Sequence, residues 1–424
     1  MDDEKLKHLF QMLDNEFAIR KEKFAKAGVS SLSAYRELGG TDVPHIVVMI
    51  DNFTALKELY FQEDAPLIQL CRDGLSVGIT VIAANSQTKG LSYKYLSYFD
   101  ARIAFYNNDS SEYGSLFDHC REIVEKIPGR CLTIHDNILL DCQTFLAFDG
   151  NLNSEIAAFA ARIHGLYGAQ RAAAIPELPE VVTTADLVSQ CAECYQTPYT
   201  IALGLDYETV DPVVRNLRKM GCLSLAGGSA EVQSAFLDRI IRQMDIVYPA
   251  KTKVWILDHI DRALQPLEEL TNVVKYSLNA TTAPEFIMEL EQKAKARMAM
   301  LELGELDNIA DWELLVLVIN NTSVADTLNT NKAALMSYVN LISKYKDMGI
   351  CVLVSNVPNA AFISSEFYKK SAENKQFLWF DNLTALKIVT VPFTISKKFS
   401  KKLESGDAYL FNDTECVKLK LPQE

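Results

Sequence analysis

The longest apolar runs of this 424-residue chain occur as two matched pairs. Residues 46–52 (IVVMIDN) resemble residues 314–321 (LLVLVINN), and residues 78–85 (GITVIAAN) resemble residues 349–356 (GICVLVSN). The second pair shares a Gly, an Ile and a terminal Asn at the same spacing. Uninterrupted apolar runs of this length are typical of strands buried on both faces of a parallel sheet.

A third pair of segments follows the first two in the same order. Residues 128–136 (PGRCLTIHD) and 405–413 (SGDAYLFND) share a Gly and a final Asp, with a strand-like run between them. Apolar positions at helical spacing occupy 4–27, 284–303 and 331–345, between the predicted strands. The matched order predicts a duplicated unit, and strands that alternate with helices predict a parallel α/β sheet in each copy.

The chain is long enough for two domains. Residues 153–172 read as the last helix of the first unit. The following AAAIPELPEV, with Pro176 and Pro179, reads as an extended linker. We therefore predict domains at 1–172 and 173–424.

Only the second unit has a front portion before its repeated segments. This portion comprises an apolar strand at 222–228, a helix at 230–244 and a second strand at 253–259. The first unit begins with its helix, and we expect it to lack the N-terminal half of its sheet. Its strands at 46–51 and 78–84 should then have an unpaired edge or an exposed apolar face, which must be covered.

Composition narrows the function classes. Hydrophobic residues make up 49% of the chain and charged residues 23%, as in globular proteins, and no run approaches the ~20 apolar residues of a membrane helix. A net charge of -13 argues against a free-standing nucleic-acid binder. One CxxC pair, Cys191 and Cys194, has no partner motif at zinc spacing. We interpret it as two reduced thiols rather than a redox or metal pair, and we expect no metal site.

A degenerate phosphate-binding loop follows the strand at 222–228. An active loop reads GxxxxGK[ST], in which the glycines allow close backbone approach and Lys contacts the β/γ phosphates. The first Gly and the final Ser stand at the right separation. The second Gly is Val232, where a positive φ would be strained, and the Lys is Gln233, while Glu231 adds a repelling charge. The candidate residues are Gly227, Gly228, Ser229, Val232, Gln233 and Ser234.

The acidic pair expected at the end of a buried strand is also incomplete. In an active site its Asp serves Mg²⁺ and its Glu orients the attacking water. The first unit has Asp51 and Asn52 here, and the second has Asn320 and Asn321. Since Asn is no base at neutral pH, we expect neither unit to hydrolyse ATP by the usual route, and we assign no catalytic residue.

Asn85 and Asn356 end the neighbouring strands at matched positions. A strand-end Asn beside the γ-phosphate position suits a sensor of nucleotide state. It equally suits a polar residue that caps a turn, and the sequence leaves both interpretations open.

These segments resemble the FtsK/SpoIIIE class of hexameric motor ATPases. The resemblance rests on IVVMIDNFTALKELY, CRDGLSVGITVIAANSQ, FDARIAF and IPGRCL. TPYTIALGLDYETVDPVVRNL and WILDHIDRALQPLEEL resemble the later ATPase modules of type VII secretion motors of the EssC/EccC type. The resemblance implies tandem RecA-like P-loop units, the first one incomplete. The departures at Gln233 and Asn320, and Asp407 in place of Arg130, put hydrolysis in doubt.

The resemblance also implies a function. We expect C-terminal, degenerate ATPase modules that recognise substrates and regulate a motor rather than hydrolyse ATP. The implied partners are small helical-hairpin secretion substrates, the rest of a membrane-anchored motor and further copies of the chain. We expect no nucleic acid and no direct membrane contact, and a cytoplasmic location at the inner face of the membrane through partners. No cofactor is expected beyond weak binding of Mg-ATP. The alternatives are a weak ATPase completed by neighbouring subunits and a fragment of a DNA translocase.

The rim of the second unit's sheet is the expected docking site for a substrate helix. It has Phe236 as an apolar neighbour on the following helix, and its own residues are Gly228, Ser229, Asn320, Asn321 and Asn356. A cleft with apolar walls and few charges suits a helix better than a triphosphate. The alternative is that the cleft is filled by its own side chains.

Overall fold

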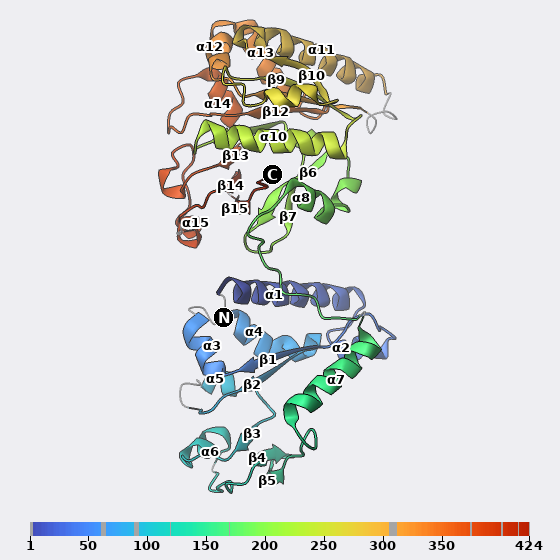
Figure 1. The fold of residues 1–424 in the computed structure, drawn as a ribbon, viewed down its shortest axis with the longest axis vertical. Helices are drawn as coiled ribbons and strands as arrows, with labels where there is room; N and C mark the ends of the chain where they lie inside the picture. The colour runs from blue at the N-terminus through green and yellow to red at the C-terminus, as the bar shows by residue number, and fades with distance from the viewer. Residues whose placement is uncertain are drawn as a thin grey trace. The chain divides into compact units, whose positions relative to one another are not determined.

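The computed structural model divides into two compact units, Met1–Pro176 and Glu177–Glu424 (Figure 1). It describes residues 3–60, 65–88, 93–118, 120–168, 170–304, 312–373, 375–399, 402–413 and 415–423. The sequence placed the boundary between 172 and 173, at the start of the same Pro-containing segment. Each unit is described by itself below.

Unit two is built on one ten-stranded sheet with the order β10-β9-β11-β12-β8-β13-β14-β15-β6-β7. The strands from β10 to β13 are parallel, and those from β13 to β7 pair antiparallel. The strand β8, which precedes the glycine turn, lies centrally between β12 and β13. The bounds are β6 Thr200–Asp206, β7 Pro212–Asn216, β8 Cys222–Ala226, β9 Thr252–Leu257, β10 Val273–Ser277, β11 Leu314–Ile319, β12 Ile350–Val354, β13 Gln376–Trp379, β14 Asp407–Asn412 and β15 Glu415–Lys420.

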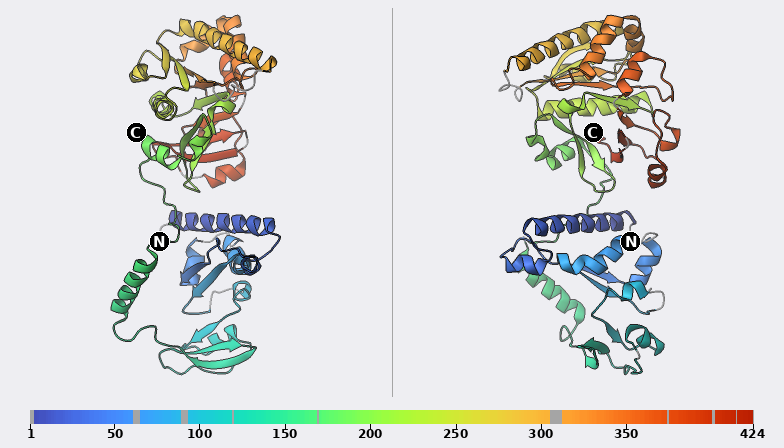
Figure 2. Two further views of the ribbon diagram at one scale, coloured as in Figure 1. Left: turned by 90° about the vertical axis from the view of Figure 1, so that its right-hand side faces the viewer. Right: turned by 180° about the vertical axis from the view of Figure 1, so that it is seen from behind.

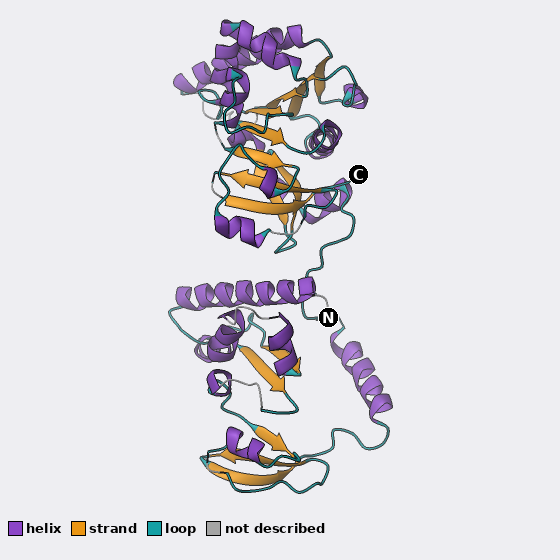
Figure 3. Ribbon diagram, turned by 90° about the vertical axis from the view of Figure 1, so that its left-hand side faces the viewer, coloured by secondary structure: helices purple, strands orange, loops and turns teal. Residues whose placement is uncertain are grey.

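Helices cover both faces of this sheet, so its central strands are buried throughout (Figures 2 and 3). One core contains the apolar side of α10, and the other contains α11, α12, α13 and α14. The continuous apolar runs of the sequence follow from this two-sided burial. The helix bounds are α8 Thr184–Gln190, α9 Leu217–Met220, α10 Ala230–Val247, α11 Ala283–Glu302, α12 Ser323–Thr330, α13 Lys332–Ile342, α14 Glu366–Ala372 and α15 Phe393–Lys398.

Unit one contains two small sheets where unit two has one large sheet. β1 and β2 form a parallel pair, and β3, β4 and β5 form a separate antiparallel sheet. Helices α1, α3 and α4 pack on one face of the parallel pair. The bounds are α1 Asp3–Lys26, α2 Leu32–Glu37, β1 Ile46–Asp51, α3 Phe53–Tyr60, α4 Ala65–Asp73, β2 Ile79–Ala84, α5 Tyr93–Leu96, β3 Ile103–Phe105, α6 Ser111–Leu116, β4 Arg130–His135, β5 Ile138–Gln143 and α7 Leu152–Tyr167.

The strand pairing confirms the duplication predicted from sequence. The amide of Ile46 donates to the carbonyl of Gly78 at 2.9 Å, and the amide of Leu315 donates to that of Gly349 at the same distance. Both glycines have positive φ, 79° and 73°. The pair β1–β2 therefore corresponds to β11–β12 residue for residue, and β3–β4–β5 corresponds to β13–β14–β15.

A pair of arginines repeats a contact that the sequence comparison missed. Arg20 on α1 donates through one guanidinium nitrogen to the carbonyl of Val77 at 2.9 Å. Arg297 on α11 donates in the same way to the carbonyl of Met348 at 2.7 Å. Each arginine thus joins the long helix of its unit to the glycine turn at the start of β2 or β12.

The replacement of Arg130 by Asp407 between the two copies is compensated. In unit one Arg130 forms an ion pair with Asp141 across the hairpin β4–β5. In unit two Asp407 forms one with Lys418, at the equivalent positions of β14–β15, with the charges exchanged and N···O at 3.0 Å. The departure noted in the sequence therefore preserves the interaction and reverses its polarity.

Unit one lacks the counterpart of β8, the strand that joins the two halves of the sheet in unit two. Among the described residues no strand lies between β2 and β3, whereas β8 pairs with both β12 and β13. Counterparts of β9, β10, β6 and β7 are missing from the two sheets as well. The expectation of an incomplete first sheet is confirmed.

None of the helices in the described part of the chain is both long and apolar enough to cross a bilayer.

Candidate functional site

The turn after β8 has the layout of a phosphate loop. The strand ends at Ala226, and Gly227 and Gly228 follow with φ of 75° and 62°. A Cβ on Gly227 would come within 2.7 Å of the ring of Trp379, so this position requires glycine for space as well as for its backbone angle. Ser229 then caps α10, which begins at Ala230.

The helix begins before the loop can form a phosphate cradle. The amide of Val232 donates to the Ser229 hydroxyl at 3.4 Å, and that of Gln233 donates to the Ser229 carbonyl at 3.3 Å. In an active loop such amides face the phosphates. The strain expected from a positive φ at Val232 does not arise, because Val232 lies in the first helical turn. Glu231, in the same turn, has its pKa lowered by a hydrogen bond from Ser229 and keeps a negative charge here.

Gln233 bonds two backbone groups on either side of the loop. Its side-chain nitrogen donates to the carbonyl of Gly227 at 2.8 Å, and its side-chain oxygen accepts from the amide of Asn356 at 2.7 Å. The side chain is buried. Gln233 therefore joins the loop to the end of β12, and it does so with a neutral group.

Asn320, the first residue after β11, forms hydrogen bonds with three side chains of its own unit. Its amide nitrogen donates to a carboxylate oxygen of Asp258 at 2.9 Å and to the Ser234 hydroxyl at 3.0 Å. Its oxygen accepts from the hydroxyl of Ser355 at 2.6 Å. Asn321 is buried too, and it donates to the carbonyls of Asp258 at 2.8 Å and Leu278 at 3.2 Å.

Asp258, at the end of β9, is the residue that sequence reasoning missed. Its carboxylate is fully buried and also accepts from the Tyr276 hydroxyl at 2.8 Å and from the amides of His259 at 2.9 Å and Leu264 at 2.8 Å. Burial, and then the bond to this carboxylate, raise the pKa of Tyr276. The only sequence signal was an Asp at the end of a buried strand, and the sheet order was needed to place it beside Asn320.

Three polar side chains at the rim of unit two are buried and bonded within their own unit, which favours the alternative left open above. The side chains of Gln233, Asn320 and Asn321 form the hydrogen bonds described above. Phe236 does not line a cleft, because it is buried in the core beneath α10, with its ring centroid 5.9 Å from that of Phe380. The expectation that Phe236 would present an apolar wall is therefore wrong.

The strand-end residues of unit one are arranged differently. Asp51 is exposed. Asn52 has φ of 59° and its side chain accepts from the amide of Ala55 at 3.1 Å, as an N-terminal cap of α3. Asn85 bonds Thr54 through both ends of its amide, at 3.3 and 2.8 Å. In unit two Asn356, with φ of 57°, donates to the Ser355 hydroxyl at 3.0 Å. Both sensor-like asparagines are held by neighbours of their own unit.

The CxxC pair shows no metal-binding arrangement. Cys191 is buried, and burial raises the pKa of its thiol to about 11. Within the part of the chain that the structure describes, no cluster of three or more His, Cys, Asp or Glu side chains is arranged to hold a metal ion.

The fold and the turn together define the class. A parallel sheet whose central strand runs into a glycine turn and a helix, with the strand of the acidic pair two places away, is a RecA-like P-loop ATPase fold. The chain carries one complete copy and the back part of another.

The relatives of this chain are the EccC, YukB and EssC proteins of type VII secretion systems. It is 25% identical over 437 residues to the ESX secretion system protein EccC of Geobacillus thermodenitrificans, covering 100% of this chain and 28% of that protein. It is 23% identical over 434 residues to YukB of Bacillus subtilis, covering 99% of this chain and again 28% of the relative. The chain thus spans well under a third of these relatives. No family model matches it.

Solved structures support the same fold. EssC (ATPases 2 and 3) from Geobacillus thermodenitrificans superposes with a TM-score of 0.75 at 23% identity, covering 100% of this chain and 80% of that one. The cytoplasmic domain of EssC gives 0.68 at 23% identity, with 99% and 83% coverage. Thermomonospora curvata EccC (ATPases 2 and 3) in complex with a signal sequence peptide gives 0.54 at 17%, with 100% and 77% coverage. The expected tandem α/β architecture is confirmed.

Proposed function

We propose that this chain serves a type VII secretion motor as nucleotide-independent ATPase modules, which recognise substrates and regulate the motor rather than hydrolyse ATP. The observation that carries the proposal is the side chain of Gln233, which bonds the loop carbonyl of Gly227 and the strand-end amide of Asn356. A neutral group of the protein itself stands where a triphosphate needs a cation.

The second half of the site supports the same proposal. Asn320 bonds three side chains of its own unit, and the helix amides nearest the loop bond to Ser229. Binding Mg-ATP would require these bonds to break without a Lys or an acidic pair to replace them. The network stabilises the fold of unit two without a ligand.

Substrate recognition is proposed from the relatives. The EccC of Thermomonospora curvata was solved with a signal sequence peptide, and EssC has a cytoplasmic domain of this fold. We place this chain in the cytoplasm on that basis. Its partners are small helical-hairpin substrates that carry such peptides, together with the rest of the motor.

The substrate helix docks beside this rim rather than in it. The segment after β12 and the segment before α15 are joined by two hydrogen bonds of Asn359, each 2.7 Å, to Ala385 and Lys387. The ring of Phe362 in the first segment and that of Phe393, the first residue of α15, are both exposed. Exposed aromatic rings on joined loops suit the apolar face of a helix.

A capture experiment tests this site. Phe362→Arg and Phe393→Arg, each in the full chain, should reduce retention of a helical-hairpin substrate from the same secretion locus at least tenfold. Phe145→Arg, an equally exposed ring in unit one, is the matched control and should retain substrate normally. Normal capture by both unit-two variants would move the docking site elsewhere.

Calorimetric titration with Mg-ATP tests the nucleotide part separately. We expect no saturable binding to unit two. Micromolar binding, or ATP turnover that appears in mixtures with neighbouring motor subunits, would favour the weak-ATPase alternative. Salt-sensitive binding to duplex DNA would favour the translocase alternative.

A further inference from the structure

A cavity of about 380 Å³ lies at the amino edge of the sheet in unit two. The parallel strands β8 and β13 begin beside it, at Cys222 and Gln376, and both residues line it. The glycine turn and the rim described above lie at the opposite end of β8. The volume is within the ~300–1,000 Å³ that small-molecule pockets occupy. The cavity is therefore a ligand-sized space separate from that rim.

The innermost part of this cavity is apolar and uncharged. Met220 at the end of α9 and Cys222 are buried, and Val339 and Ile342 of α13 complete the apolar lining. Burial raises the pKa of the Cys222 thiol to about 12, so this group is neutral at pH 7. The inner lining thus offers apolar contacts and no charge.

Three lysines and one glutamate line the same cavity, which gives it a net charge of +2. Lys370 is paired, because its Nζ lies 2.8 Å from an oxygen of Glu373 and 4.0 Å from one of Glu366. Lys219 and Lys346 are exposed, and within the described part of the chain the side chain of neither forms an ion pair or a hydrogen bond. The cavity therefore has two unpaired cations, although the chain as a whole carries a net charge of -13.

Close packing holds together the two elements that carry Lys219 and Lys346. Gly221, which follows α9, has φ of 69°, and a Cβ there would lie 3.4 Å from both the carbonyl oxygen of Ile342 and the Cβ of Lys346. The carbonyl of Gly221 accepts from the amide of Val352 in β12 at 2.8 Å. The turn after α9 is thus fixed against the end of α13, and the two lysines lie on neighbouring segments.

Lysines near a helix end often neutralise its C-terminal partial charge of about −0.5. In the last turn of α13, the carbonyl of Val339 already accepts from the amide of Ser343 at 3.1 Å and from its hydroxyl at 2.6 Å. The carbonyl of Asn340 accepts from the amide of Tyr345 at 2.8 Å. The helix α9 has only four residues, so its dipole is small. The ends of α13 and α14 together would offset about one charge, and the net charge of +2 leaves a positive surplus.

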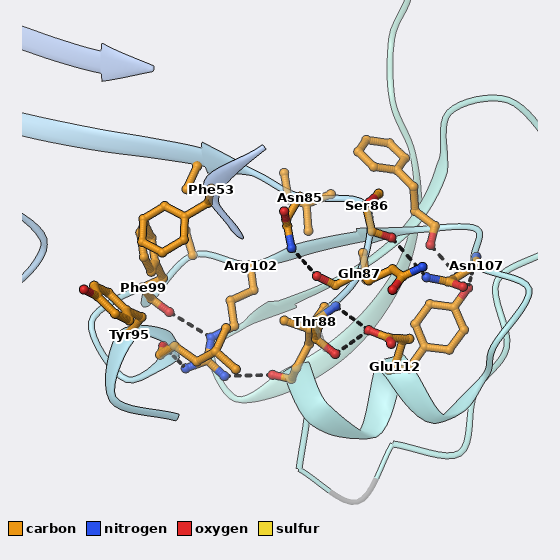
Figure 4. A pocket seen from close by; sticks show the side chains of 18 of the residues that line it. Phe53, Asn85, Ser86, Gln87, Thr88, Tyr95, Phe99, Arg102, Asn107 and Glu112 are labelled. Carbon is orange, nitrogen blue, oxygen red and sulfur yellow. Dashed lines mark hydrogen bonds between the residues drawn. The ribbon is translucent and has the colours of Figure 1, made fainter. Parts of the chain in front are cut away.

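The cavity of unit one has no such surplus (Figure 4). It measures about 470 Å³, and its two charged lining residues are Arg102 and Glu112. Arg102 donates to three backbone carbonyls at 2.8–2.9 Å, and Glu112 accepts from the amide and the hydroxyl of Thr88. Both charges are thus satisfied within unit one, in contrast to those of Lys219 and Lys346.

We propose that the cavity between α9, α13 and α14 is a binding site for a small carboxylate that carries an apolar chain. The chain contacts the inner lining, and the carboxylate lies between Lys219 and Lys346. Each ammonium group can donate a charge-assisted hydrogen bond to one carboxylate oxygen. Glu373 beside them disfavours a ligand with more negative charge. The site belongs to unit two alone and does not depend on the proposed function.

Octanoate is the probe, and the experiment uses the full chain. Calorimetric titration should show saturable binding, and hydrogen exchange followed by mass spectrometry should show slower exchange at 217–222 and 339–346. Acetate should bind at least tenfold more weakly, because it cannot reach the apolar lining. Octylamine has the same chain with the opposite charge and should protect neither segment.

Substitutions of the lysines test the charged part of the site. Lys219→Gln and Lys346→Gln should each reduce octanoate affinity at least threefold, and the double variant at least tenfold. Lys344→Gln is the matched control, because Lys344 is exposed close by but stacks on the ring of Tyr345, 5.2 Å from its centroid, and does not line the cavity. Since these lysines are exposed, unfolding followed by tryptophan fluorescence should show that each variant is folded.

Unchanged exchange at both segments in excess octanoate would overturn the proposal. Protection confined to unit one, where apolar side chains are also exposed, would overturn it as well. Equal protection by octylamine would show that the lysines do not select the ligand, and would count against the proposal in the same way. Wild-type affinity in a folded double variant, or an equal loss in Lys344→Gln, would exclude Lys219 and Lys346 as the carboxylate site.

Discussion

The substitution Gln233→Lys gives the loop the Lys that the phosphate-loop motif has at this position. We expect it to destabilise unit two without creating a nucleotide-binding site. The lysine has no acceptor for the Asn356 amide that Gln233 now satisfies at 2.7 Å. An unpaired buried amide costs about 1–3 kcal/mol. Burying an ammonium group without a partner carboxylate costs several kcal/mol more unless it escapes to solvent. We expect a loss of about 3 kcal/mol or more in the free energy of unfolding.

Gln233→Met separates the two costs, because it removes both hydrogen bonds and adds no charge. It should destabilise by about 1–3 kcal/mol. All three tryptophans, Trp255, Trp312 and Trp379, lie in unit two. Denaturant unfolding followed by tryptophan fluorescence therefore reports on unit two alone, and calorimetric titration of the same samples with Mg-ATP measures binding.

We expect no saturable Mg-ATP binding in Gln233→Lys. The amide of Val232 in the first turn of α10 remains bonded to Ser229, and Asn320 remains bonded to Asp258. A variant as stable as the parent chain that binds Mg-ATP with micromolar affinity would refute this reasoning. It would show that a positive charge at position 233 is enough for the loop to bind Mg-ATP.

Three further predictions concern other contacts. Arg297→Met and Arg20→Met should each lower the stability of their own unit by about 1–3 kcal/mol, because backbone carbonyls lose their hydrogen-bond donor. Circular dichroism follows both units and tryptophan fluorescence follows unit two, so together they assign the loss to a unit. A loss of stability in the other unit would contradict the prediction. Lys418→Met should lower the free energy of unfolding by about 3–5 kcal/mol because it leaves Asp407 buried and charged. The double variant Asp407→Lys with Lys418→Asp should recover part of this loss. A double variant no more stable than Lys418→Met would contradict the contribution of the ion pair to stability. Cys191 should resist iodoacetamide at pH 7.5 in the folded chain, and because its pKa is raised to about 11, its contribution to stability should fall as pH rises from about 9 towards 11; rapid labelling of native protein would contradict this.

The sequence predicted the elements well because their signals are local. The runs at 46–52 and 314–321 became β1 and β11, and the helices predicted at 4–27 and 230–244 became α1 and α10. Burial on both faces removes the alternation of polar residues, so such strands are conspicuous.

The details of the site could not be read from the sequence because they depend on neighbours distant in the chain. Asp258 lies 62 residues before Asn320, and only the sheet order brings the two side chains to 2.9 Å. The same reason explains the error at Phe236, whose place on the buried side of α10 depends on Phe380. The sequence identified what was missing from the phosphate loop, but it gave no sign that Gln233 would close it.

The exchanged ion pair has a consequence for how this chain avoids misassembly. Tandem copies of one fold can exchange equivalent strands while they fold, and such exchanges trap the chain. If β4 paired with β15, Arg130 would face Lys418; if β14 paired with β5, Asp407 would face Asp141. Both hybrid hairpins set like charges against each other, whereas both native hairpins join opposite charges. The reversal of one ion pair thus favours the two native hairpins over the two hybrid ones.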